Sequence, residues 1–311
     1  MVKLADRLDV MAAVRAAFVE VAAGGTQAAP VLRAPASAPD QAINVKFAAA
    51  GTLVGGKIGT YWPDNVDRGL DNHCATTILL DPDTGFPAAF IAARTLNRLR
   101  TAAGNAIATE ALSRPDSRIL ALVGAGAQSV HEARAIARVR DLDEIRIGAR
   151  DPDRAAATAH ALEPLGISVR ICSIADAVAG ADLIVTITSA REPLVRSEWV
   201  GAGTHISAMG ADAKGKQELA PELTERATLF ADWPDQSLVI GELQHGHRLG
   251  LFTRDAVTAI GDVLSGATPV RRSASDITLF DSSGLAVQDL HVAHAALEAA
   301  RAAGLVEEVA F

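Results

Sequence analysis

The pattern of apolar and polar residues is clearest around residues 118–139. Ile119 to Val123 form a short run of apolar residues, which is typical of a strand buried on both faces. A Gly124-Ala125-Gly126 turn follows, and after Gln128 the apolar residues return at the spacing of a helix. We therefore predict a strand, a tight glycine turn and the start of a helix.

Strand and helix patterns alternate through the rest of the chain. Strands are predicted over residues 144–148, 168–171, 183–186, 205–209, 229–231 and 277–280. Helices are predicted over residues 100–112, 152–162, 174–178 and 289–303. Such alternation produces a parallel sheet with right-handed crossovers. The predicted fold class is α/β, with a Rossmann-like, doubly wound parallel sheet.

Residues before about 95 have a different pattern, mostly strands behind one helix. An apolar stripe predicts a helix over residues 6–22, and prolines favour an extended segment over residues 30–39. Strands are predicted over residues 42–47, 56–62, 76–80 and 87–93. This change of pattern predicts a domain boundary near residue 115.

The glycine turn has the physical properties of a dinucleotide site. Gly124 allows the tight turn and Gly126 lets the backbone approach a pyrophosphate, while the helix N-terminus offers N–H groups to it. Ser129 stands where the third glycine of the fingerprint is expected. Glycine turns after strands are common, but here the second strand also follows at the right distance. We predict a nucleotide site rather than a purely structural turn.

Composition and charge narrow the function classes. The 311 residues are 49% hydrophobic and carry a net charge of −8, which disfavours a nucleic-acid partner. Cys74 and Cys172 are too few for a disulfide framework or a zinc knuckle. The charged N-terminus is unlike a signal peptide, and no apolar run reaches membrane-spanning length. We expect a cytoplasmic protein without a membrane partner.

Several stretches in order along the chain resemble the ornithine cyclodeaminase/μ-crystallin family. They are KIGTYWPDN (57–65), NHCATTILLDPDTG (72–85), RTAAGNAIAT (100–109), VGAGAQS (123–129), SAMGADAKGKQEL (207–219) and SSGLAVQDL (282–290). The resemblance implies a Rossmann NAD(P)-binding domain over residues 116–285. It also implies an α+β substrate-binding and dimerisation domain from both chain ends, residues 1–115 and 286–311. The implied chemistry is hydride transfer at the α-carbon of an amino or imino acid, in a homodimer.

Three cations match the family's cluster for the substrate carboxylate: Arg33, Lys57 and Arg100. A carboxylate needs fixed cations, and the planar fork of arginine holds both of its oxygens. Most lysines and arginines are solvated surface charges, so the motif context carries this prediction. Lys57 is also expected to take part in catalysis.

Other polar residues extend the predicted site. Asp212 follows an apolar strand and is expected to handle a proton at the substrate nitrogen, although aspartate also caps helices. Lys46 is a candidate for a second substrate carboxylate and His73 for a substrate hydrogen bond, with a solvated lysine and a structural histidine as alternatives. His245 and His247 have a poor spacing for a metal, and we predict no metal site.

The resemblance leaves three functions open. An ungapped alignment puts Asn44 where ornithine cyclodeaminases have a glutamate for the distal ammonium, and Asp40 is the only acid between Arg33 and Lys57. A buried ammonium without a partner is costly, so an NAD(P)H-dependent α-imino-acid reductase, reversible as an amino-acid dehydrogenase, is favoured. The motifs look most like those of iminosuccinate reductase and ketimine reductases, and pyrroline-2-carboxylate is an equally valid substrate class. The alternatives are ornithine cyclodeamination to proline and a μ-crystallin-like NADP-dependent binding protein.

The choice of cofactor rests on the end of the second Rossmann strand. Arg150 offers a cation for a 2′-phosphate, whereas Asp151 would oppose that phosphate if it turned inward. The balance favours NADP over NAD by a small margin. The predicted cofactor-binding set is Gly124, Gly126, Ala127, Gln128, Arg150, Thr188 and Met209.

Overall fold

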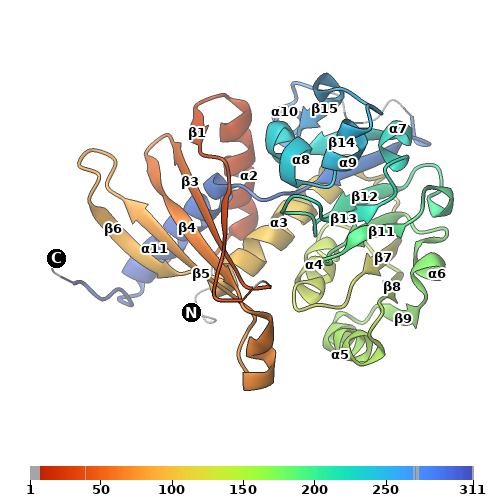
Figure 1. Ribbon diagram of the computed structural model, residues 1–311, viewed down its shortest axis with the longest axis horizontal. Coiled ribbons are helices and arrows are strands. Elements are labelled where there is room, and N and C mark those ends of the chain that lie inside the picture. The colour runs from red at the N-terminus through yellow and green to blue at the C-terminus, as the bar shows by residue number, and fades with distance from the viewer. Residues whose placement is uncertain (1–7, 39, 269, 271–272, 310–311) are drawn as a thin grey trace. The chain divides into compact units, whose positions relative to one another are not determined.

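A computed structural model describes residues 8–38, 40–268, 270 and 273–309 (Figure 1). Its contacts divide the chain into two compact units, residues 1–100 with 285–311 and residues 101–284. The first boundary lies inside helix α3 (Arg94–Leu112) rather than near residue 115. The helix runs on past this boundary, and Asn105 and Leu112 in its second half bond to residues of the larger unit.

The larger unit is built on an eight-stranded sheet with the order β15-β14-β16-β12-β10-β7-β8-β9. Every neighbouring pair is parallel, which confirms the predicted doubly wound α/β fold. The strands are β7 (Ile119–Val123), β8 (Glu144–Gly148), β9 (Ser168–Cys172), β10 (Leu183–Thr186), β12 (His205–Ala208), β14 (Ala227–Ala231), β15 (Val257–Ala259) and β16 (Ile277–Asp281).

Helices connect these strands, as crossovers between parallel strands require. They are α4 (Ser129–Ile136), α5 (Pro152–Leu162), α6 (Ile174–Val178), α7 (Leu223–Arg226), α8 (Pro234–Ile240), α9 (Gln244–Arg248) and α10 (Ile260–Leu264), with 3₁₀ turns η2 (Glu163–Leu165), η3 (Ser197–Trp199) and η4 (Arg254–Ala256). A two-stranded sheet of β11 (Arg191–Val195) and β13 (Gln217–Leu219) was not predicted. These strands are short and pair across a long sequence separation, so their pattern carries little local signal.

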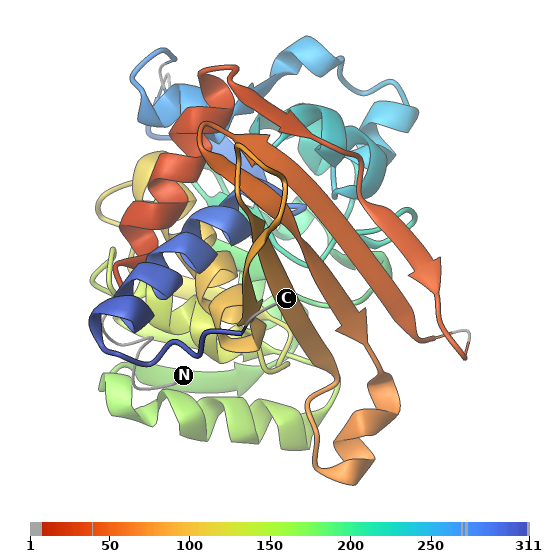
Figure 2. The ribbon, with the colours of Figure 1, turned by 90° about the vertical axis from the view of Figure 1, so that its left-hand side faces the viewer.

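The smaller unit contains a six-stranded antiparallel sheet. Its strands are β1 (Thr26–Ala28), β2 (Leu32–Pro35), β3 (Ala42–Ala50), β4 (Leu53–Tyr61), β5 (His73–Leu80) and β6 (Pro87–Ala92), and η1 (Pro63–Arg68) follows β4. Helices α2 (Val10–Ala22) and α11 (Ala286–Ala302) lie on one face of this sheet (Figure 2). α11 begins slightly before the predicted residue 289, and its Val287 and Leu290 are fully buried.

The two faces of this sheet carry different residues. On the inner face, Ala48, Ala50 and Leu79 pack against α11. The next row along that face is Lys46, Lys57 and Thr77, which are directly opposite one another. An apolar core therefore gives way to charged residues along one face, because side chains alternate along each strand.

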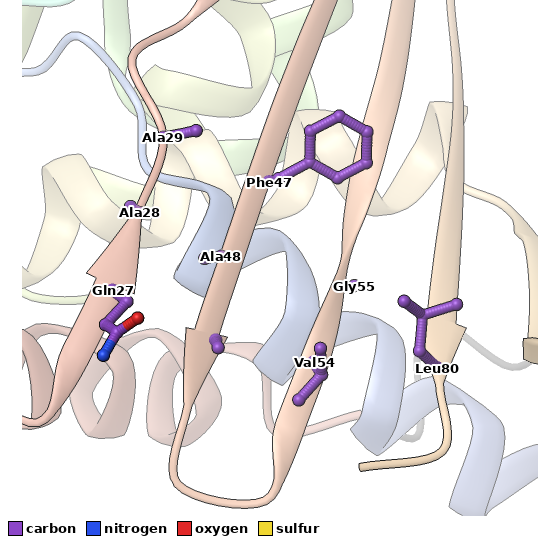
Figure 3. A pocket seen from close by; sticks show the side chains of 9 residues that line it. Gln27, Ala28, Ala29, Phe47, Ala48, Val54, Gly55 and Leu80 are labelled. Atoms are coloured by element: carbon purple, nitrogen blue, oxygen red, sulfur yellow. The ribbon is translucent and has the colours of Figure 1, made fainter. Parts of the chain in front are cut away.

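The outer face of the sheet is apolar and exposed. By register, Leu32, Phe47, Ile58 and Phe90 all point to this side, and they are 63%, 53%, 39% and 55% exposed. Figure 3 shows a hollow on this face, where Phe47, Val54 and Leu80 project from neighbouring strands with α11 behind them. These exposed apolar side chains lie on four strands of the same face.

In the part of the chain that the structure describes, every helix is too short or too polar to cross a lipid bilayer.

Candidate active site

Two buried cations of the smaller unit share one carboxylate. Lys57 lies in β4 and Arg100 on α3, with exposed fractions of 6% and 7%. Lys57 Nζ donates to Asp289 Oδ1 of α11 at 2.8 Å and lies 2.7 Å from Oδ2. Arg100 Nε lies 3.0 Å from Asp289 Oδ1, as an ion pair without an aligned hydrogen bond. The structure thus brings two predicted site residues, hereafter the cation pair, onto a carboxylate that the sequence had not singled out.

Two neutral side chains orient the cation pair further. Asn97 Oδ1 accepts hydrogen bonds from Lys57 Nζ at 2.7 Å and from Arg100 Nη2 at 3.1 Å. Gln288 Oε1 accepts one from Arg100 Nη1 at 3.2 Å. These acceptors come from α3 and α11, so rigid helices rather than loops set the directions of both cations.

The electrostatics of the cluster bring Lys57 near the midpoint of its titration at neutral pH. Burial, followed by the positive charge of Arg100, lowers the pKa of Lys57 from 10.5 to about 7, and the charge of Asp289 opposes them. Burial would raise the pKa of Asp289, but the charges of Arg100 and Lys57 outweigh it and its pKa lies below the usual value. Asp289 is therefore ionised at neutral pH, while the charge of Lys57 responds to small changes around it.

Lys46 and Arg33 lie on the same inner face as Lys57. Lys46 is directly opposite Lys57 in the β3–β4 pair. Arg33 is opposite Asn44 in the β2–β3 pair, with Nη1 3.4 Å from Asn44 Oδ1. Paired residues point to the same side of a sheet. Three predicted substrate cations and the neutral Asn44 therefore share one surface.

His73 lies farther along that face. It begins β5 opposite Tyr61, and the two ring centroids are 4.9 Å apart. Tyr61 is four residues beyond Lys57 on β4, which is about 13 Å along a strand. His73 is thus on the inner face of the sheet but not in the cation pair, and its substrate role stays a prediction.

The glycine turn of the larger unit lies at a reversal of the strand order. β7 has β8 on one side and β10 on the other, and ligands of open α/β sheets bind at such a point. Gly124 has φ +115°, and a Cβ on it would lie 2.8 Å from Ile187 O and 2.9 Å from Thr188 Cγ2. A Cβ on Gly126 would meet no atom within 4 Å. The turn therefore fits tightly on its inner side and leaves open space for a pyrophosphate at Gly126.

The residues after Gly126 organise the start of α4. Ser129, at the place of the third fingerprint glycine, accepts a hydrogen bond from Gly126 N through Oγ at 3.1 Å. Ala127 and Gln128 lie between them, and Gln128 Nε2 donates to the buried Glu132 at 2.7 Å. The serine thus supports the turn that a glycine would otherwise only permit.

Thr188 and Met209 follow β10 and β12, and a buried carboxylate joins their loops. Glu218 Oε1 accepts hydrogen bonds from Thr188 N at 2.6 Å and Thr188 Oγ1 at 2.7 Å. Its Oε2 accepts from Gly210 N at 2.9 Å and from Thr186 Oγ1 at 2.8 Å. A Cβ on Gly210 would lie 2.5 Å from both carboxylate oxygens. Glu218 is fully buried, and burial raises its pKa although these donors oppose the shift.

Arg150 and Asp151 follow β8 and differ in their contacts. Asp151 caps α5, accepting hydrogen bonds from Asp153 N and Arg154 N at 3.1 Å each. Its other oxygen lies 3.2 Å from Arg154 Nε. Arg150 is exposed at the end of β8. Asp151, whose charge would repel a 2′-phosphate, therefore accepts its hydrogen bonds from the start of α5.

Asp212 lies in the turn between β12 and β13 and does not cap a helix. Its Oδ1 accepts a hydrogen bond from Lys216 Nζ at 2.6 Å, and the same nitrogen donates to Gly210 O at 3.1 Å. The capping alternative is thus excluded, while the proton-handling role stays a prediction.

Sequence reasoning missed three partners of the predicted residues, namely Asp289, Lys216 and Glu218. All three lie in the motifs that carried the resemblance, SSGLAVQDL and GADAKGKQEL. The signal in the sequence was that these residues are charged and lie inside the motifs. Their partners lie far away in the sequence or across a turn, so the spacing of residues does not indicate these contacts.

His245 and His247 lie in α9. His245 Nε2 lies 2.8 Å from Lys216 O. Within the described ranges, no group of three or more histidine, cysteine, aspartate or glutamate residues is arranged to hold a metal ion.

Comparison with known proteins places these observations in a family. The family model of the ornithine cyclodeaminase/mu-crystallin family matches residues 2–304. The chain belongs to this family. The sequence resemblance is thereby confirmed over nearly the whole chain.

Individual family members match over most of their length. The iminosuccinate reductase of Paracoccus denitrificans is 38% identical over 299 residues, 96% of this chain and 93% of that protein. Its crystal structure in complex with NAD+ has a TM-score of 0.91 at 37% identity, covering 97% of this chain and 94% of that chain. An archaeal alanine dehydrogenase dimer with bound NAD has a TM-score of 0.91 at 34% identity, with 97% and 94% covered.

A cyclodeaminase is also similar. The ornithine cyclodeaminase of Agrobacterium fabrum is 35% identical over 253 residues, 80% of this chain and 70% of that protein. Family membership alone therefore does not choose between reduction and cyclodeamination, and the site residues must carry that choice.

Proposed function

We propose that the protein is an NAD(P)H-dependent reductase of an α-imino acid, reversible as an amino-acid dehydrogenase. The observation that carries this proposal is the buried cation pair of Lys57 and Arg100, held in fixed directions by α3 and α11. Buried cations with N–H groups fixed by helices are suited to orient a small carboxylate. Family membership and the nucleotide turn of the larger unit support the hydride chemistry.

In the proposed reaction, Arg100, Lys57 and Arg33 bind the α-carboxylate and so fix the position of the imine carbon. The reduced nicotinamide, when bound, supplies a hydride to that carbon. The imine nitrogen gains a proton as the C=N bond becomes C–N, and Asp212, directly or through water, is proposed to pass that proton on or to stabilise the protonated nitrogen. Lys216 holds Asp212 by the 2.6 Å hydrogen bond. The turn at Gly124 and Gly126, with Ala127, Gln128, Thr188 and Met209, forms the proposed cofactor site.

The preferred substrate in this proposal is a dicarboxylic imino acid such as iminosuccinate. Lys46 lies opposite Lys57 on the inner face, and we propose that it binds the second carboxylate. Asn44 on that face is neutral and offers no charge to the distal ammonium of ornithine, which would be costly to desolvate alone. The similarity to an iminosuccinate reductase agrees with this choice.

The experiment that tests the function measures oxidation of the reduced cofactor by absorbance. NADH and NADPH are each offered with oxaloacetate plus ammonia, pyruvate plus ammonia or methylamine, and pyrroline-2-carboxylate. We expect the highest kcat/KM with oxaloacetate plus ammonia. Proline formed from L-ornithine with NAD, and no imine reduced, would restore the cyclodeaminase alternative. Cofactor binding without any turnover would favour a binding protein.

For the cofactor, we propose a preference for NADP, carried by Arg150. Asp151 caps α5, and the exposed Arg150 at the end of β8 is the group proposed to bind a 2′-phosphate. The relatives described above carry NAD, which makes a direct test necessary. Arg150→Ala is expected to raise the KM for NADPH by about 10- to 150-fold, as loss of one charge-assisted contact costs roughly 1.5–3 kcal/mol. The KM for NADH should change much less, and equal changes would contradict the assignment.

We also propose a homodimer through the outer face of the smaller unit's sheet. The exposed Leu32, Phe47, Ile58 and Phe90 form an apolar surface typical of a subunit interface. Phe47→Glu places a charge in its centre and is expected to convert a dimer into monomers in sedimentation equilibrium. A wild-type protein that is monomeric at micromolar concentration would contradict this proposal.

A further inference from the structure

The inner face around Lys57 holds an unbalanced set of charges. The charged groups that act on Lys57 are Lys46 from β3, Arg100 from α3 and Asp289 from α11. Asn97 and Gln288 beside them are neutral acceptors. Among the residues that the structure describes, three cations therefore surround one carboxylate, which is 5% exposed. A buried cation without a partner is strongly unfavourable, so that single carboxylate has a large influence on the cluster.

We propose that Asp289 is the positioning residue of the cation pair, which keeps Lys57 and Arg100 side by side and favours the protonated form of Lys57, without touching the substrate. Both of its oxygens lie within 2.8 Å of Lys57 Nζ, and Oδ1 lies 3.0 Å from Arg100 Nε. Its place in the first turn of α11 also suits a negative charge, since the helix dipole stabilises an anion there. The identity of the ligand as a carboxylate rests on the proposed function.

This geometry couples carboxylate binding to proton uptake. At neutral pH the lysine, whose pKa is about 7, carries a full charge in only part of the molecules. A carboxylate that binds beside it favours the charged form, so binding draws a proton from solution. Affinity for the carboxylate should consequently fall as the pH rises through about 7. Without Asp289, the charge that opposes burial and Arg100 is lost, so the pKa of Lys57 falls further and this loss of affinity occurs at lower pH.

The direct test is a pH titration of the lysine side chains by NMR. The chain has only five lysines, residues 3, 46, 57, 214 and 216, so ¹³Cε-labelled lysine gives few signals, and Lys57→Arg identifies that of Lys57. We expect Lys57 to titrate near pH 7 in the wild type and at least one pH unit lower in Asp289→Asn. Asp289→Glu, which keeps the charge, should return the midpoint toward the wild-type value.

A matched control uses another side-chain contact of α11. Glu20 of α2 accepts from His291 Nε2 at 2.7 Å, outside the cation pair. Glu20→Gln should leave the titration of Lys57 unchanged. An unchanged midpoint in folded Asp289→Asn, or a wild-type Lys57 that titrates near its ordinary value, would overturn the proposal.

A second measurement follows the ligand. Isothermal titration calorimetry with succinate, in buffers of different ionisation enthalpy, should show proton uptake by the wild type at pH 7.5. In Asp289→Asn the pH above which succinate binding weakens should move down by at least one unit. The NMR result needs no turnover, so absence of imine reduction with the expected Lys57 titration would reject the proposed function and retain the role of Asp289.

Discussion

Replacing Arg100 with leucine is expected to lower kcat/KM for imino-acid reduction by about 10²–10³-fold, since removing one partner of a buried charge pair costs roughly 2–5 kcal/mol. Arg100 is 7% exposed, and each of its three nitrogens faces an acceptor on α3 or α11. Leucine removes the fork that orients the carboxylate and leaves Asp289 with Lys57 as its nearest cation. Steady-state kinetics with the best substrate of the panel measure the loss.

Two further variants make this result interpretable. Arg100→Lys keeps the charge but not the planar fork, so an intermediate loss is expected. Arg98→Leu alters the same helix two residues earlier, where Arg98 pairs with Asp71 at a partly exposed site, and should change kcat/KM by less than about threefold, as surface ion pairs contribute little. NADH affinity, followed by fluorescence, should remain near wild type in all three. Activity of Arg100→Leu within threefold of wild type would remove Arg100 from the site.

Replacing Glu218 with alanine is expected to weaken NADH binding at least tenfold and to lower the free energy of unfolding by about 2–6 kcal/mol, because two backbone N–H groups lose their acceptor at roughly 1–3 kcal/mol each. Those groups belong to Thr188 and Gly210, whose loops follow β10 and β12 at the proposed cofactor site. Fluorescence titration with NADH and urea unfolding measure the two effects separately.

The control for Glu218 preserves part of the hydrogen bonding. Glu218→Gln keeps one acceptor oxygen, so it should fold more stably than the alanine variant and bind NADH with intermediate affinity. Glu192→Gln, on the exposed surface of β11, should change neither quantity. If Glu218→Ala were destabilised while its NADH affinity stayed at the wild-type value, Glu218 would be a structural residue without influence on the cofactor loops.

The order of the helices and strands could be predicted from the sequence because the patterns that indicate them are local. The run from Ile119 to Val123 and the glycines after it predicted β7 and its turn, and the structure confirms both. A strand buried on both faces needs a continuous apolar run, and a tight turn needs glycine, so each of these elements can be predicted from its own residues. The end of α4 at Ile136, three residues before the end of the 118–139 region, shows that the ends of helices are the hardest to predict.

The partners within the site were not accessible in the same way. Lys57 and Asp289 are separated by 232 positions, and no spacing relates them. Glu218 and Thr188 meet only because β13 pairs with β11 beside the strand ends. That Lys46 and Lys57 share a face depends on the register of β3 against β4, since a shift of one residue would turn either lysine to the opposite side.

The sequence by itself determined the fold class, the family and which cations and glycines to examine, since apolar periodicity and turn residues act over a few positions and the motifs kept their order. Only the tertiary structure decided that one carboxylate holds Lys57 and Arg100 and that Glu218 joins two loops. Burial and charge pairing depend on which distant segments meet, and these determine the pKa of Lys57. In the sequence Lys57 is an ordinary cation. In the folded protein it is therefore a group that titrates near neutral pH.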